Sequence, residues 1–186
     1  MGAILSSLRN TVIVGIIVML AVSFGLDADG QSSNFIGRYL HVISGVMWIG
    51  LLWYFNFVQI PTMPSIPDEL KPAVGKHIAP EALFWFRWGA MATLVTGLYV
   101  AMVSGYMKEA FMLEEGFRLI GVGMYMAIIM WFNVWFVIWP NQKKALGMVE
   151  ADADTKAAAA RTAMLFSRTN TLLSIPMLYC MVGMSS

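Results

Sequence analysis

Long apolar stretches alternate with short polar segments along the chain. Four stretches reach the roughly 20 residues that a helix needs to cross a bilayer, and a fifth, at the N-terminus, is marginal. The pattern therefore predicts an all-α integral membrane bundle of about five transmembrane helices, forming one domain over residues 1–186. The predicted spans are Thr11 to Leu26, Phe35 to Ile60, Ala82 to Tyr106, Phe117 to Trp139 and Ala163 to Met184.

Prolines mark the expected ends of two spans. Proline cannot donate a backbone hydrogen bond and clashes with the carbonyl four residues back. We therefore expect no continuous helix after the second span, where Pro61, Pro64, Pro67 and Pro72 follow, and an end of the fourth span at Pro140. The alanine-rich stretch "EADADTKAAAARTA" predicts a helical extension ahead of the last span.

Composition agrees with a membrane protein. Hydrophobic residues make up 59% of the chain and charged residues 12%, and the mean hydropathy is +0.68. This leaves too little polar surface for a soluble globule of this size. The net charge of +1, without a long basic run, predicts no nucleic-acid partner. The single cysteine, Cys180, allows neither a disulfide within the chain nor a CxxCH site for covalent haem.

Basic residues predict the orientation, because they are retained on the cytoplasmic side of a membrane. With the N-terminus inside, nine of the twelve lie on the cytoplasmic side: Arg9, Lys71, Lys76, Arg87, Lys143, Lys144, Lys156, Arg161 and Arg168. We therefore predict a multi-pass protein of a bacterial inner membrane, with a cytoplasmic N-terminus and a periplasmic C-terminus.

The second span carries the candidate chemistry, in "GRYLHVISGVMWIGLLWYFNF". Arg38, His41, Gly45 and Trp48 follow i, i+3 and i+4 spacing and so share one helix face. A histidine in hydrocarbon must be hydrogen-bonded, metal-bound or facing water. Gly45 would leave room for a flat ring, and Arg38 could hold a carboxylate near the membrane surface. The pattern predicts a b-type haem with its iron on His41.

A packing interpretation stays open, in which His41 bonds a carbonyl and Gly45 lets two helices approach. For haem, the second axial position would be empty, filled by Met102, Met124 or Met177, or supplied by His41 of a second copy across a two-fold axis. His77 is expected in a loop at the opposite membrane surface, without a ligand role.

Three intramembrane amides are further candidates, because such side chains bond across helices. Asn56, Asn133 and Asn170 all fall in the predicted cytoplasmic halves of their spans. We expect one interhelical polar network there, either as structural contacts or as part of a substrate or proton path.

Several motifs together resemble the membrane domain of the cytochrome-linked urate hydroxylases, from about Arg38 to the C-terminus. They are "RYLHVISGVMWIG", "YFNFVQ", "WFRWGAM", "NVWFVIWPNQKKALG" and "NTLLSIPMLY". That family joins a multi-helix membrane domain to a cytochrome c domain, which is thought to receive the substrate's electrons. By this resemblance, the matching motif positions are Arg38, His41, Trp48, Asn133, Pro140, Asn141 and Gln142. One helix, "LHVISGVMWIGLLWYFNF", also resembles the small haem-associated protoporphyrinogen oxidases.

The chain departs from the urate hydroxylase pattern at important positions. Phe84 and Thr169 stand where the family carries histidines, and Gly89 stands where it carries an acidic residue. With no CxxCH motif, the cytochrome domain is expected to be absent. We therefore expect that this chain alone does not oxidise urate.

The sequence thus predicts a membrane protein that binds b-type haem and transfers electrons, alone or as a subunit of a larger oxidoreductase. Its expected partners are the bilayer, other membrane redox proteins or a separate cytochrome c, and a second copy of the chain. One alternative is a non-catalytic helical subunit that packs against partner membrane proteins. Another is a membrane oxidase acting on a purine or a porphyrin.

The charge bias makes a topological prediction. Reporter fusions at Lys144 and at Ser186 should give opposite readings, cytoplasmic for the first and periplasmic for the second. Identical readings at the two positions would contradict the five-span topology.

Overall fold

The computed structural model describes residues 2–26 and 33–183, and all regular elements among them are helical. Elements η2, η4 and η5 are π-helical and η3 is a 3₁₀ turn. In chain order they are α1 (Gly2–Leu5), α2 (Leu8–Leu26), α3 (Ser33–Trp53), η2 (Tyr54–Gln59), α4 (Ile60–Thr62), η3 (Met63–Ser65), α5 (Lys71–Ala73), η4 (Val74–Ile78), α6 (Ala79–Val103), α7 (Met107–Phe111), α8 (Arg118–Phe132), η5 (Asn133–Ile138), α9 (Trp139–Ala145) and α10 (Ala153–Gly183).

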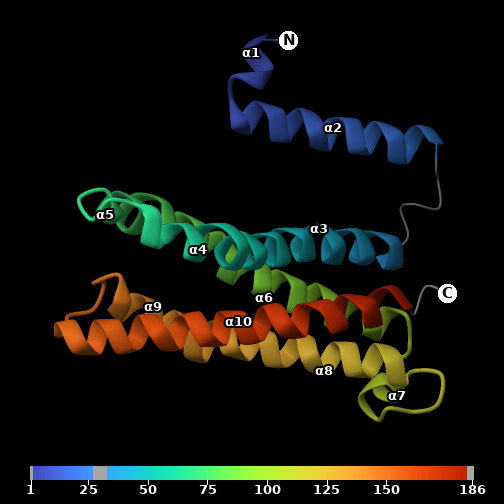
Figure 1. Ribbon diagram of the computed structural model, residues 1–186. Helices are drawn as coiled ribbons and strands as arrows, with labels where there is room; N and C mark the ends of the chain where they lie inside the picture. The colour runs from blue at the N-terminus through green and yellow to red at the C-terminus, as the bar shows by residue number, and fades with distance from the viewer. Residues whose placement is uncertain (1, 27–32, 184–186) are drawn as a thin grey trace.

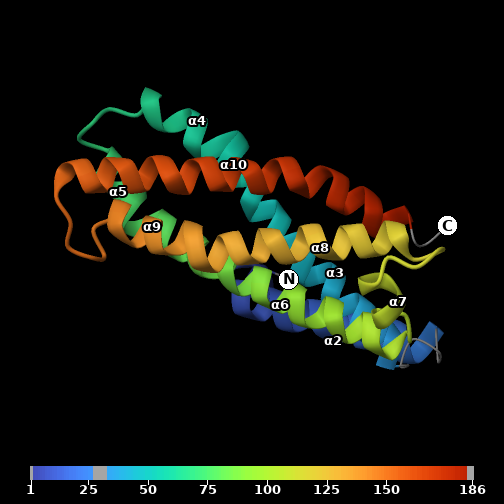
Figure 2. The ribbon, with the colours of Figure 1, turned by 90° about the horizontal axis from the view of Figure 1, so that it is seen from below.

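Two antiparallel helix pairs form the bundle, α3 with α6 and α8 with α10 (Figures 1 and 2). One hydrophobic cluster joins the pairs. Its largest buried members are Trp48 and Leu52 from α3, Phe86 from α6 and Met130 from α8. This cluster lies toward the end where η2, η5 and the start of α6 meet, so the bundle is held together mainly in that half.

Small residues bring α3 and α6 close together. A Cβ at Gly37 would lie 2.8 Å from the ring of Tyr99, and one at Gly89 would lie 3.3 Å from the backbone nitrogen of Trp48. Glycine is the residue that allows such approaches between membrane helices. Glycines on each helix therefore make room for the backbone or a large side chain of the other helix.

The prolines do not end the helices as predicted. The helix that begins at Ser33 continues through Pro61 to Ser65, and the helix that begins at Arg118 continues through Pro140 to Ala145. The predicted end at Pro140 is wrong, because a π turn before that proline relieves the clash. The predicted break after the second span is confirmed, but later than expected: the helix passes Pro61, ends at Ser65, and the backbone is extended at Ile66.

The π turns share one geometry. The backbone N–H of the residue just before each proline bonds the carbonyl five residues back, in Ile60 to Phe55, Ala79 to Val74 and Trp139 to Val134. The wider turn moves the clashing carbonyl aside, so the helix continues past a residue that has no N–H to donate.

Four helices are long and apolar enough to cross a membrane: Leu8–Gly25, Ser33–Ser65, Lys71–Val103 and Arg118–Ala145. The fifth predicted span lies in α10, which does not reach that hydropathy because residues such as Arg168 and Asn170 interrupt its apolar sequence. The last residue of that predicted span, Met184, lies outside the described residues.

The predicted helical extension ahead of the last span is confirmed, since α10 begins at Ala153. The side chain of Asp152 accepts hydrogen bonds from the backbone N–H of Thr155 at 2.7 Å and from its hydroxyl at 2.8 Å. These bonds cap the helix start and lower the pKa of Asp152.

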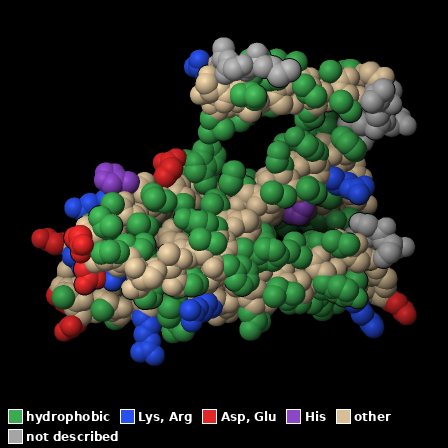
Figure 3. Space-filling view, turned by 45° about the horizontal axis from the view of Figure 1, so that its top comes forward, with side chains coloured by type: hydrophobic (Ala, Val, Ile, Leu, Met, Phe, Trp, Pro, Cys, Tyr) green, Lys and Arg blue, Asp and Glu red, His purple; other side chains and the backbone are tan. Residues whose placement is uncertain are grey.

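The surface is hydrophobic over the middle of the bundle, and charged side chains gather at the end that holds α5, α9 and the start of α10 (Figure 3). Helix α2 stands apart from the other helices (Figure 1), and no residue of its apolar 18-residue window is buried. Its exposed apolar side chains suit contact with lipid or with another protein.

The close glycine contacts make a stability prediction. A Cβ at Gly123 would lie 2.8 Å from Cβ of Cys180, whereas nothing lies within 4 Å of one at Gly50. Gly123→Ala should lower the free energy of unfolding by about 1–3 kcal/mol. Gly50→Ala should leave it unchanged or raise it by up to about 1 kcal/mol. Denaturant titration in detergent micelles measures both, and equal effects would contradict close α8–α10 packing.

Candidate functional site

The ring of His41, on α3, lies against α6. Its Nδ1 is 3.0 Å from the backbone carbonyl oxygen of Thr93 and 3.3 Å from Oγ1 of Thr96. The Thr96 hydroxyl donates its proton to the carbonyl of Ala92 at 2.6 Å, so its oxygen can only accept a hydrogen bond from Nδ1. Both neighbours of Nδ1 are therefore hydrogen-bond acceptors.

These partners assign the tautomer of His41. A carbonyl oxygen can only accept, so Nδ1 carries the proton and Nε2 keeps its lone pair. No hydrogen bond joins Nε2 to another of the described residues. The ring is thus oriented by α6, and one basic nitrogen is left for a further ligand.

Gly97 leaves the space that the His41 ring occupies against α6. A Cβ at this position would lie 2.8 Å from Cε1 and 3.2 Å from Nδ1 of His41. Any larger residue would push the imidazole away from the Thr93 carbonyl. Sequence reasoning missed Gly97, Thr93 and Thr96, because their relation to His41 arises only when α3 and α6 pair.

The other predicted cofactor residues lie in different surroundings. Gly45 faces α6, where its Cβ would meet Cγ2 of Thr93 at 4.0 Å, and Trp48 is 1% exposed within the hydrophobic cluster. The buried Nε1 of Trp48 has no hydrogen-bond partner. Arg38 is exposed, one turn from His41 toward the start of α3. It also lies near enough to Tyr106 to oppose the rise in the pKa of Tyr106 that burial causes.

The three methionines predicted as possible haem ligands lie in three different places in the structure. Met102 is 59% exposed. It follows Gly97 by five residues, so its side chain points to a different side of α6. Met124 and Met177 are buried in two different hydrophobic clusters. The structure therefore does not gather the three methionines into one ligand set.

His77 is exposed within η4, so it lies in a helix rather than in the loop that was predicted. Twenty residues separate it from Gly97, which is roughly 30 Å along one helix. Figure 3 shows the two histidine side chains well apart. His41 and His77 therefore belong to opposite ends of the bundle.

Among the described residues, no three His, Cys, Asp or Glu side chains come together to hold a metal ion. Haem differs from a bare metal ion, because the porphyrin fills four positions on the iron and a single histidine can hold it. Nε2 of His41 can supply that single nitrogen.

Two of the three predicted amides meet. Nδ2 of Asn133 donates to Oδ1 of Asn170 at 2.9 Å, and Nδ2 of Asn170 donates to the carbonyl of Met130 at 2.9 Å. Asn56 does not join them. Its Nδ2 donates instead to Oγ of Ser167 at 2.8 Å. The predicted single network is thus two separate contacts, each tying α10 to another helix.

A family model described as urate oxidase N-terminal matches residues 116–185. The match covers less than half of the chain and confirms the predicted resemblance over this part, which includes Asn133, Gln142 and Asn170 but not His41. No curated protein matches the chain. No solved structure matches it either.

The Asn133–Asn170 contact should be measurable as a coupling energy. We expect Asn133→Ala and Asn170→Ala to be non-additive by roughly 0.5–1.5 kcal/mol in a double-mutant cycle of unfolding in micelles. Asn141, whose amide bonds only the Val137 carbonyl of its own helix, is the matched control and should couple to neither. Additive effects of Asn133 and Asn170 would contradict the contact.

Proposed function

We propose that this protein belongs to the urate oxidase N-terminal family and is an integral membrane redox protein that holds a b-type haem on Nε2 of His41. The observation that carries the proposal is the hydrogen bond of Nδ1 to the Thr93 carbonyl. Histidines that ligate metals nearly always donate their other ring N–H to a carbonyl or carboxylate, which fixes the ring and raises its basicity.

Each of the following residues would have its own role in holding the haem. His41 supplies the axial nitrogen, while Thr93 and Gly97 keep the imidazole in place. Arg38, exposed one turn away, is the residue suited to pair with a propionate. Gly45 and Trp48 help pack α3 on α6, so we assign them a supporting role rather than contact with the macrocycle. When bound, haem supplies one-electron transfer at its iron.

The proposed setting follows from the charges. The end that holds Lys71, Lys143 and Lys144 would face the cytoplasm of a bacterial inner membrane, and His41 would lie toward the periplasmic side. At that side the haem could exchange electrons with another membrane redox protein or with a separate cytochrome c.

Two other functions have an observation behind them. The exposed apolar surface of α2 favours a helical subunit that packs against partner membrane proteins. The family match favours an oxidase acting on a purine. In this chain, however, Phe84 and Thr169 stand where the urate hydroxylases carry histidines, so residues that the resemblance links to that reaction are replaced. Product formation in washed membranes tests the oxidase.

The haem proposal predicts a spectrum. Purified protein should show a reduced-minus-oxidised absorption typical of b-type haem, and His41→Ala should abolish it because the axial nitrogen is lost. His77→Ala is the matched control and should retain the full signal, since His77 lies at the other end of the bundle. Circular dichroism checks that both variants remain helical.

Gly97→Leu tests the same site without removing the ligand. Its side chain would displace the His41 ring, so haem content should fall at least several-fold while His41 remains in the chain. A colourless wild-type protein, or a helical His41→Ala variant that keeps its haem, would contradict the proposal and leave the accessory-subunit function as the better account.

A further inference from the structure

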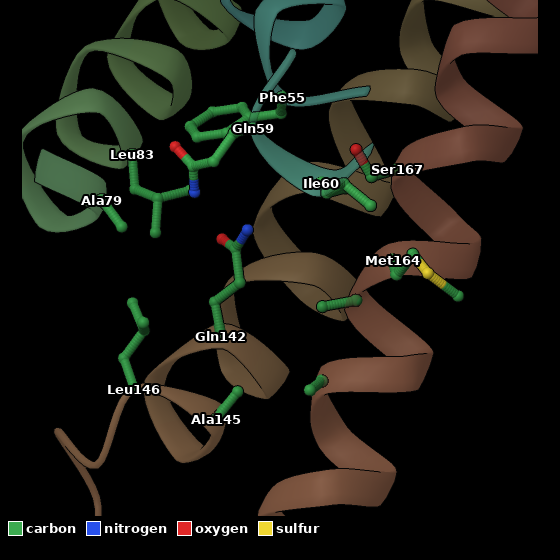
Figure 4. Close-up of a pocket in the computed structure, with 12 residues that line it drawn as sticks. Phe55, Gln59, Ile60, Ala79, Leu83, Gln142, Ala145, Leu146, Met164 and Ser167 are labelled. Atoms are coloured by element: carbon green, nitrogen blue, oxygen red, sulfur yellow. The ribbon is translucent and has the colours of Figure 1, made fainter. Parts of the chain in front are cut away.

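A pocket of about 170 Å³ lies at the end of the bundle away from His41. Its walls come from the end of η2, the start of α6, α9 and the first half of α10 (Figure 4). Gln59 on η2 and Gln142 on α9 extend their amides into it from opposite sides, pointing toward one another.

The polar atoms at this pocket are unusual because they are buried without partners. Oε1 of Gln59 and Oε1 of Gln142 are both inaccessible to solvent and accept no hydrogen bond, and no hydrogen bond joins the two amides. Buried carbonyl oxygens in proteins are nearly always paired, so the pocket holds two acceptors to which the described protein residues donate no hydrogen bond.

A third polar group stands at the same wall. Oγ of Ser167 accepts a bond from Nδ2 of Asn56, which leaves the serine proton free to donate. Oδ1 of Asn56 is also buried and unpaired. The remaining walls are apolar, with Phe55 and Leu83 on one side and Leu146 and Met164 on others.

Size and charge limit what can bind. A cavity of roughly 150 Å³ holds a benzene ring, so this pocket accommodates one ring with a few substituents. All of its lining side chains are uncharged, and an ion without a partner charge is costly to bury, which favours a neutral ligand. Because both oxygens are shielded from solvent, each amide would turn about its Cγ–Cδ bond to accept a hydrogen bond from a ring that carries two N–H or O–H donors.

From these features we infer that the pocket is a binding site for a neutral, flat, single-ring molecule that donates hydrogen bonds to Gln59 and Gln142. The site is independent of the haem proposal, because Gln59 lies 18 residues from His41, or roughly 27 Å along the helix. Two kinds of molecule carry the required chemistry, a dihydroxy aromatic ring and a cyclic amide.

Calorimetric titration of the full chain in detergent micelles tests the site. The probes are benzene-1,4-diol, uracil, and p-xylene, which has the shape of the diol without its donors. At least one donor probe should bind saturably, about tenfold or more tighter than p-xylene, because each donor satisfies a buried oxygen. The donor probe that binds more tightly shows whether the natural ligand is a dihydroxy aromatic ring or a cyclic amide.

Variants locate the binding. Gln59→Leu and Gln142→Leu should each weaken the donor probe about tenfold while leaving p-xylene unchanged. Asn141→Ala is the control, since its amide bonds the Val137 carbonyl and does not line the pocket. No binding of either donor probe, equal binding of p-xylene, or unchanged binding in both glutamine variants would overturn the site. The comparison of probes on the wild-type chain decides the question even if a variant does not fold.

Discussion

The close approach of α3 and α6 is the interaction on which the rest of the structure depends. Gly89 lets the backbone of α3 at Trp48 come near α6, and Gly97 lets the His41 ring approach that helix. Because lipid offers helices no hydrophobic reason to associate, this fit of glycines on one helix against larger residues of the other supplies the packing. The same fit brings the Thr93 carbonyl to Nδ1, so the geometry that builds the bundle also orients the half-buried imidazole of His41.

A second constraint acts along the helices. In a membrane every backbone donor and acceptor must be satisfied within the protein, so a proline inside a span is costly unless the backbone adjusts. Here the adjustment is a π turn before Pro61, before Pro80 and before Pro140. Two of these turns have a further effect, since Gln59 closes η2 and Gln142 follows Pro140. Both glutamines enter the same pocket from these altered helix ends.

Much of the fold could be predicted from hydropathy alone, because spans of apolar residues are a strong and local signal. The helix ends could not, since proline chemistry predicts a break and only the surrounding helices show that a π turn replaces it. His41 was found as a polar residue in an apolar run. Its partners were not, because Thr93 is 52 residues away and has no pattern that links it to His41.

The asparagine contacts also show that partners far apart in the sequence are hard to predict. Asn133 and Asn170 were predicted to meet and do, whereas Asn56 pairs with Ser167, a residue that is unremarkable in sequence. Gln59 and Gln142 each belong to a motif of the family resemblance, but nothing in those motifs predicts that the two side chains line one pocket. A pocket formed by four segments has no signature in any one of them.

The central claim is that α6 holds His41 with its proton on Nδ1 and a free lone pair on Nε2. Nitrogen-15 NMR of histidine-labelled, haem-free protein at neutral pH tests this directly, with His77→Ala leaving a single histidine to assign. The account predicts the neutral tautomer protonated at Nδ1, with the Nε2 resonance of an unprotonated nitrogen. A proton on Nε2 would contradict it, because Nδ1 could not then donate to the Thr93 carbonyl and the free lone pair would face α6 instead of a ligand.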